Sequence, residues 1–273
     1  MPDFTPIGAL LGGLLGTQET AAADARLPVT PVDAGAVDTG LPPLDALTGG
    51  WRPGELVLVT GGPGAGKSAL LYGQALHAAR GTAAAVALAP LKHTARVSLW
   101  RLACALADVE IGRVMRAALD REERGRMTEA TARLGALPLH LLVSVDATVE
   151  DVAEKARRLH RSRGLRLLAV DGLHALGMAE EETEPVTRER RLLSVTAALA
   201  ELGRELAVPV LASVSPEADA ERLAPLARRL LRIGPADPRT GNATLHLRGA
   251  PGEERVAEVR FVAERLRFED AAE

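Results

Sequence analysis

The chain of 273 residues has few aromatic side chains, since two Trp, one Tyr and three Phe amount to 2% of its residues. Aliphatic side chains must therefore fill the core. Hydrophobic residues make up 47% and charged residues 25%, an ordinary globular composition that argues against wholesale disorder. So few rings also argue against a platform that stacks the bases of single strands. Any contact with nucleic acid would depend mainly on electrostatics.

Excess positive charge, paired cysteines and long apolar runs are also missing. The net charge of −3 provides no overall basic surface for nucleic acid. The single cysteine, Cys104, lies in an apolar helical pattern, which favours core packing over a reactive thiol.

No uncharged apolar run reaches the ~18 residues that span a bilayer. The apolar stretch over residues 7–16 follows Asp3 and no basic residue, unlike a signal peptide. We therefore expect a cytoplasmic protein without a membrane partner.

The chain divides into a short N-terminal segment and one large domain. Residues 1–35 are rich in Gly, Ala, Pro and Thr without sustained periodicity, which is typical of a flexible tail or linker. Alternatively, four leucines form a short helix that docks elsewhere: Leu10, Leu11, Leu14 and Leu15. Residues 36–270 are expected to form the single domain.

From residue 56 onward, short apolar runs alternate with longer helical patterns, which predicts βαβ units in a mostly parallel sheet. The predicted strands cover residues 56–60, 84–89, 139–144, 165–171 and 208–214. The predicted helices cover residues 67–79, 96–107, 121–134, 148–163 and 188–206. Shorter strands over residues 230–233, 243–247, 256–262 and 266–268 alternate with turn residues and predict an antiparallel extension at one sheet edge. The fold class is therefore α/β.

The segment GGPGAGKS, from Gly61 to Ser68, matches the phosphate-loop pattern G-x-x-x-x-G-K-[ST] between a predicted strand and a predicted helix. Such a loop turns its backbone amides inward, and the helix start adds unpaired N–H groups that bind phosphate oxygens. Lys67 would contact the β and γ phosphates of ATP, and the Ser68 hydroxyl would help to hold Mg²⁺. The alternative is a glycine-rich turn that binds nothing. The predicted nucleotide-binding residues are Gly61, Gly62, Pro63, Gly64, Ala65, Gly66, Lys67, Ser68 and Ala69.

A metal-binding acid is the second requirement of such a site. The stretch LRLLAVDG places Asp171 at the end of an apolar strand. At the carboxyl edge of a parallel sheet its carboxylate would face the phosphate loop and hold Mg²⁺ through water. The alternative is an ordinary loop residue.

Five stretches together resemble the C-terminal motor domain of DnaB-type replicative helicases, over roughly residues 38–270, and more distantly the RadA and KaiC ATPases. They are DTGLPPLDALTGGWRPGELVLV, GGPGAGKS, LLAVDGLHAL, ELAVPVLASVS and LRGAPGEERVAEVRF. The resemblance implies a RecA-like fold, ATP and Mg²⁺ as cofactors, and assembly into a hexameric ring. It also implies that Lys67 and Ser68 bind phosphate and magnesium, and that Asp171 is the magnesium acid. Arg248 matches an arginine finger that reaches a neighbouring subunit's ATP; alternatively it is a solvated strand residue.

The chain departs from the family at the catalytic base. The family ends its second core strand in a glutamate that orients the attacking water, and here AVALAPLKH places Pro90 at that position. Gly172 follows Asp171, so no acid stands there either. Ser215 matches the family's polar sensor, and Gly172 and His174 replace its tyrosine and glutamine. We therefore predict that nucleotide binding is retained and hydrolysis is impaired.

Members of the family bind single-stranded DNA with loops that line a central channel. The matching segments, residues 178–191 and 214–229, mix acids with bases, and the candidate arginines are Arg188, Arg190, Arg191, Arg228 and Arg229. These arginines either bind single-stranded DNA or lie on solvated helix faces.

Three functional alternatives stay open besides an ATP-binding protein with impaired hydrolysis. They are an active helicase or translocase with another acid, a regulatory or scaffold module gated by ATP, and a small-molecule phosphotransferase.

Overall fold

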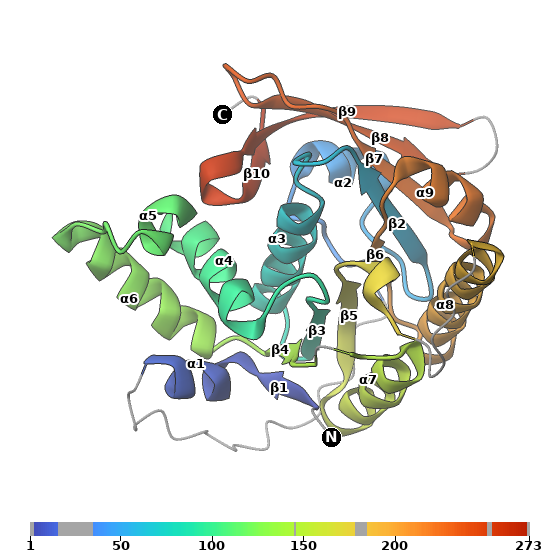
Figure 1. Cartoon of the computed structure of the whole chain (residues 1–273), viewed down its shortest axis with the longest axis horizontal. Coiled ribbons are helices and arrows are strands. Elements are labelled where there is room, and N and C mark those ends of the chain that lie inside the picture. The colour runs from blue at the N-terminus through green and yellow to red at the C-terminus, as the bar shows by residue number, and fades with distance from the viewer. Residues whose placement is uncertain (1–2, 16–34, 145, 178–184, 250–252, 272–273) are drawn as a thin grey trace.

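The computed structural model describes residues 3–15, 35–144, 146–177, 185–249 and 253–271. These residues contain one sheet of ten strands in the order β1-β4-β3-β5-β6-β2-β7-β8-β9-β10 (Figure 1). The strands are β1 (Phe4–Pro6), β2 (Leu56–Gly61), β3 (Ala85–Ala89), β4 (Leu139–Leu142), β5 (Leu165–Val170), β6 (Val210–Ser213), β7 (Arg229–Ile233), β8 (Asn242–Arg248), β9 (Glu254–Val262) and β10 (Arg267–Asp270). The helices are α1 (Ile7–Leu15), α2 (Pro42–Thr48), α3 (Lys67–Arg80), α4 (Ala95–Ala107), α5 (Ile111–Met115), α6 (Arg121–Gly135), α7 (Val149–Arg163), α8 (Pro185–Leu206) and α9 (Glu217–Leu223).

The six central strands, from β4 to β7 in the sheet order, run parallel, whereas β8, β9 and β10 are antiparallel. The predicted α/β class with a mostly parallel sheet and an antiparallel extension is confirmed. One detail of the prediction was wrong, because β7 pairs parallel with β2 and the extension begins only at β8. The turn signals near residue 240 identify the β7–β8 hairpin but do not determine the other neighbour of β7.

Helices cover both faces of the sheet. Side chains alternate along each buried strand, so Val57 and Val59 of β2 pack with α3, while Leu56 and Leu58 pack on the opposite face with α8. Figure 1 shows α3, α4 and α6 on one side of the sheet, and α7 and α8 on the other. Cys104 of α4 is buried, and burial raises the pKa of its thiol to about 12, as expected for core packing. No helix among the described residues is long and apolar enough to cross a membrane.

The N-terminal residues differ from the expected tail. β1 pairs antiparallel with β4, and Ile7 and Leu11, one turn apart on α1, are buried in the core. The strand covers the sheet edge at β4, which would otherwise expose unpaired backbone groups. The alternative of a docked helix thus describes residues 7–15, whereas residues 16–34 lie outside the described part of the chain.

His140 of β4 is buried beside β1, and burial lowers the pKa of its imidazole to about 4. Between pH 6.5 and about 4, the unfolded chain binds a proton there that the folded chain does not. Stability should therefore fall on acidification through this window. We expect the free energy of unfolding in urea to drop by about 2 kcal/mol more between pH 7 and pH 5 in the wild type than in His140→Gln. His77→Gln, which removes an exposed histidine, should keep the wild-type pH dependence.

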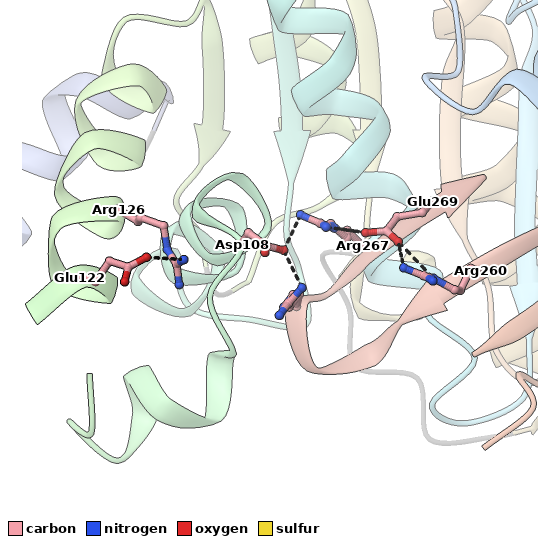
Figure 2. Close-up of polar contacts among 7 residues, drawn as sticks. Asp108, Glu122, Arg126, Arg260, Arg267 and Glu269 are labelled. Carbon is pink, nitrogen blue, oxygen red and sulfur yellow. Dashed lines mark hydrogen bonds and ion pairs between the residues drawn. The ribbon is translucent and has the colours of Figure 1, made fainter. Parts of the chain in front are cut away.

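Ion pairs connect the C-terminal strands to α4 (Figure 2). Arg267 lies between Asp108, at 2.7 Å, and Glu269, whose Oε1 accepts a hydrogen bond of 2.6 Å from Arg267 Nε. Arg260 of β9 also donates to Glu269, from Nε at 3.1 Å. Each pair is partly exposed and adds little stability alone, but the forked arginine contacts define how β9 and β10 lie against α4. This arrangement brings two aromatic rings of the extension to the phosphate loop.

Candidate nucleotide-binding site

The loop from Gly61 to Ser68 lies between β2 and α3, as predicted. Gly66 caps α3 with a φ of 93°, a left-handed conformation that only glycine adopts without strain. A Cβ on Gly66 would lie 2.8 Å from Cζ of Phe268, whose ring stacks on Phe261 at 4.6 Å between centroids. The antiparallel extension therefore packs directly against the loop. The stacked rings leave no space there for a side chain.

Lys67 lies across this loop. Its Nζ donates hydrogen bonds of 2.6 and 2.9 Å to the carbonyl oxygens of Gly61 and Gly62. The pKa of Lys67 is lowered, first by burial and then by the positive charge of Lys92, while Asp171 and Glu217 oppose the shift. The ammonium is thus held within the loop by the loop's own carbonyl oxygens.

The other predicted loop residues differ in exposure. Pro63 and Gly64 are exposed at the tip, and Ser68 is half-buried in the first turn of α3. Ala65 and Ala69 are buried with their side chains in the protein, so only their backbone is available to a ligand. The first amides of α3 have no carbonyl partner within the helix, and such a helix start binds anions.

Asp171 follows β5 directly, and its side chain is completely buried. Oδ1 accepts a hydrogen bond of 2.8 Å from Ser213 Oγ at the end of β6, the strand between β5 and β2. Oδ2 has no hydrogen-bond partner among the described residues. An unpaired buried carboxylate oxygen is costly unless a cation balances it. Carboxylate and hydroxyl oxygens are the ligands that Mg²⁺ prefers, so Asp171 and Ser68 fit a Mg²⁺ bound with triphosphate.

Lys92 is a site residue that the sequence did not reveal. Its Nζ lies 4.0 Å from Asp171 Oδ1, too far for a hydrogen bond but close enough for strong attraction. Its aliphatic stem covers Gly172, where an added Cβ would lie 2.7 Å from Lys92 Cγ. Pro90 is buried directly after β3, and which residue corresponds to the family's glutamate stays a prediction. The turn after Ala89, closed by bonds such as His93 N to Pro90 O, decides which side chain reaches the site.

The hydroxyl residue that contacts Asp171 is Ser213, two positions before the predicted Ser215. The strand ends at Ser213, whose side chain points to Asp171 across neighbouring strands. His174 is not in contact with Asp171; its Nε2 lies 2.8 Å from Asp219 Oδ2, which links the 3₁₀ turn η1 (Leu173–Ala175) to α9. The strand ends, which sequence patterns place only within a few residues, determine this geometry.

Arg248 lies away from the loop of its own chain. It pairs with Leu230 at the beginning of β7, whereas Gly61 is level with Ile233 at the end of β7. Its guanidinium forms a partly exposed ion pair of 2.7 Å with Glu221 of α9. The register and this ion pair thus place Arg248 beside α9 and not at the tip of the loop.

The five candidate arginines of the expected channel segments differ in exposure in the structure. Arg188, Arg190 and Arg228 are exposed, and Arg191 is half-buried. Arg229 instead forms a largely buried ion pair of 3.3 Å with Glu55 and lies over the ring of the core residue Trp51, so it is not available to DNA. Residues 178–184 of the first segment lie outside the described residues.

The sequence and the fold are similar to those of known proteins. The chain is 28% identical over 176 residues to the replicative DNA helicase DnaB of Geobacillus stearothermophilus, a match that covers 64% of this chain and 38% of the helicase. The chain thus spans less than half of the curated relatives it matches. The ATPase domain of G40P superposes with a TM-score of 0.76 at 18% identity, covering 88% of this chain and 93% of that domain.

A second solved structure, of a DnaB-like replicative helicase and its interactions with primase, superposes with a TM-score of 0.75 at 18% identity. It covers 94% of this chain and 65% of that one. Both superpositions establish the RecA-like fold. The family model of the DnaB-like helicase C-terminal domain matches residues 36–221, which include the phosphate loop, Lys92, Asp171 and Ser213. The chain belongs to the family of DnaB-like helicase C-terminal domains.

Proposed function

We propose that the chain binds ATP with its phosphates in the loop from Gly61 to Ser68, and that it hydrolyses ATP slowly or not at all. The observation that carries this proposal is the pairing of an intact phosphate loop with a fully buried Asp171, one of whose oxygens is left without a hydrogen-bond partner in the described structure. Mg²⁺, bound by Ser68 and Asp171, would neutralise phosphate charge when present.

Slow hydrolysis follows from the groups around Asp171. An attacking water needs a proton acceptor, and the side chains beside Asp171 are the Ser213 hydroxyl, which donates to Asp171, and the ammonium of Lys92, which accepts no proton. A positioned general base contributes about 10²- to 10⁴-fold to a rate. We therefore expect turnover well below about one per second, the lower end of the range typical of enzymes. A DNA-independent, ATP-gated scaffold is the function in best agreement with this chemistry.

A second candidate is an active ATPase that takes its acid from α9. Besides Asp171, the carboxylate whose charge acts on Lys67 is Glu217, in the first turn of α9. Glu217 is exposed and follows β6, on the sheet edge that carries the site. A water between Glu217 and the phosphates would have a proton acceptor.

Steady-state turnover by the purified chain, with and without single-stranded DNA, separates the two functions. We expect saturable ATP binding without turnover, unchanged by DNA. Turnover near one per second that DNA stimulates and that Glu217→Gln removes would establish an active motor. Glu189→Gln, at an exposed site on α8, is the matched control. Absence of ATP binding would refute both functions.

We also propose that the chain forms a homo-oligomer in which Arg248 of one subunit meets the nucleotide of its neighbour, because Arg248 is level with Leu230 at the beginning of β7, whereas Gly61 of its own loop is level with Ile233 at the end. Arg248→Ala should leave the affinity for ATP within about twofold, since the exposed ion pair with Glu221 contributes little. Light scattering should show that ATP no longer increases the mass of the particle, because the variant does not assemble. Arg232→Ala, which removes another exposed ion pair on the neighbouring strand, should keep that increase.

A further inference from the structure

We infer that Lys92 is a built-in counter-ion of the phosphate site, which takes over part of the charge neutralisation that a divalent cation supplies. The inference rests on the proposed binding of ATP. It predicts that the chain binds nucleoside triphosphate with little dependence on Mg²⁺.

Lys92 lies beside the carboxylate of Asp171. Its ammonium lies 4.0 Å from Asp171 Oδ1, beside the carboxylate expected to bind the metal. The lysine stem lies over Gly172, where a residue with a Cβ would displace it. The side chain of Lys92 is 34% exposed, so its charged end remains in contact with solvent while its stem is packed. The lysine is thus held in position by Gly172 and by the attraction of Asp171.

Two positive charges lie at the candidate site. Lys67 is hydrogen-bonded to the carbonyl oxygens of Gly61 and Gly62, and Lys92 lies 4.0 Å from Asp171, so both ammonium groups belong to the sheet edge that carries the phosphate loop. Two neighbouring ammonium groups with one fully buried carboxylate form a site suited to the negative charge of a triphosphate. A divalent ion at Asp171 would have to displace Lys92 or lie close to it, and both cost free energy.

Lysine is rare in this chain, which is consistent with a specific role for Lys92 at the candidate site. The sequence contains three lysines, Lys67, Lys92 and Lys155, against a large number of arginines. Two of the three meet at the candidate site. Arginine, which is bulkier and prefers forked contacts, would not fit as a compact charge between Gly172 and Asp171.

The test compares ATP binding in excess EDTA and in millimolar Mg²⁺, measured with a fluorescent ATP analogue. Wild type should show a Kd that changes by less than about threefold between the two conditions, whereas Lys92→Gln should bind at least about tenfold more tightly with Mg²⁺ than with EDTA. Arg96→Gln, which removes an exposed positive charge four residues away, should behave as wild type. A wild type as dependent on Mg²⁺ as Lys92→Gln would overturn the inference.

A second measurement uses Mg²⁺ alone and needs no nucleotide. Because Lys92 competes for Asp171, Mg²⁺ should raise the melting temperature of Lys92→Gln and not that of wild type. An equal shift in both proteins would contradict the role of Lys92. If no variant binds ATP but Mg²⁺ stabilises Lys92→Gln selectively, the proposed function fails while the competition at Asp171 holds.

Discussion

Lys67→Ala is expected to weaken ATP binding by about 100-fold, as measured by calorimetric titration. The ammonium of Lys67 is partly buried and already hydrogen-bonded within the loop, so it is positioned to bind phosphate oxygens without further ordering. A hydrogen bond to a charged group contributes about 1.5 to 3 kcal/mol, and two such contacts suffice for a loss of this size.

Arg80→Ala is the matched control, because Arg80 is exposed in the last turn of the same helix α3. It should leave the affinity for ATP unchanged. Both variants should fold, which circular dichroism can verify, since neither side chain contributes to the core. An unchanged affinity in Lys67→Ala would mean that the triphosphate is not bound in this loop.

Gly66→Ala is expected to weaken ATP binding by about 10- to 100-fold. Alanine at a φ of 93° carries strain of about 1 to 3 kcal/mol, and its Cβ would lie 2.8 Å from Phe268 Cζ. The loop would leave its binding conformation, and the apparent affinity falls with the fraction of molecules that retain it. Calorimetric titration with ATP measures the loss.

Gly73→Ala is the control for this substitution, because Gly73 lies inside α3 and an added Cβ would have no atom within 4 Å besides the backbone of its own helix. It should stabilise the protein by up to about 1 kcal/mol in urea unfolding, since alanine is the better helix former. The double variant Gly66→Ala with Phe268→Ala should recover only part of the affinity, because it removes the close contact but not the backbone strain. Complete recovery would show that steric contact alone is responsible.

Local patterns determined much of this protein. The buried strands β2, β3 and β5 and the helices between them follow from apolar runs and helical periodicity along contiguous residues. The phosphate loop and Asp171 follow for the same reason, since a strand end next to a glycine-rich turn or an acid is visible in a few adjacent residues. The sheet order then brings these carboxyl ends to one edge, as expected for parallel strands.

Contacts between distant segments were decided only by the tertiary structure. β1 is three residues long and gains its stability from β4, so its own sequence carries too little signal to distinguish it from a tail. Lys92 reaches Asp171 across a turn, Ser213 contacts it from a neighbouring strand, and Phe268 packs on the loop from the end of the chain. Such contacts depend on where each strand ends within one or two residues, a distance at which a side chain changes direction. The sequence by itself determined the central strands, the helices between them and the phosphate loop, while the tertiary structure decided which charges surround that loop.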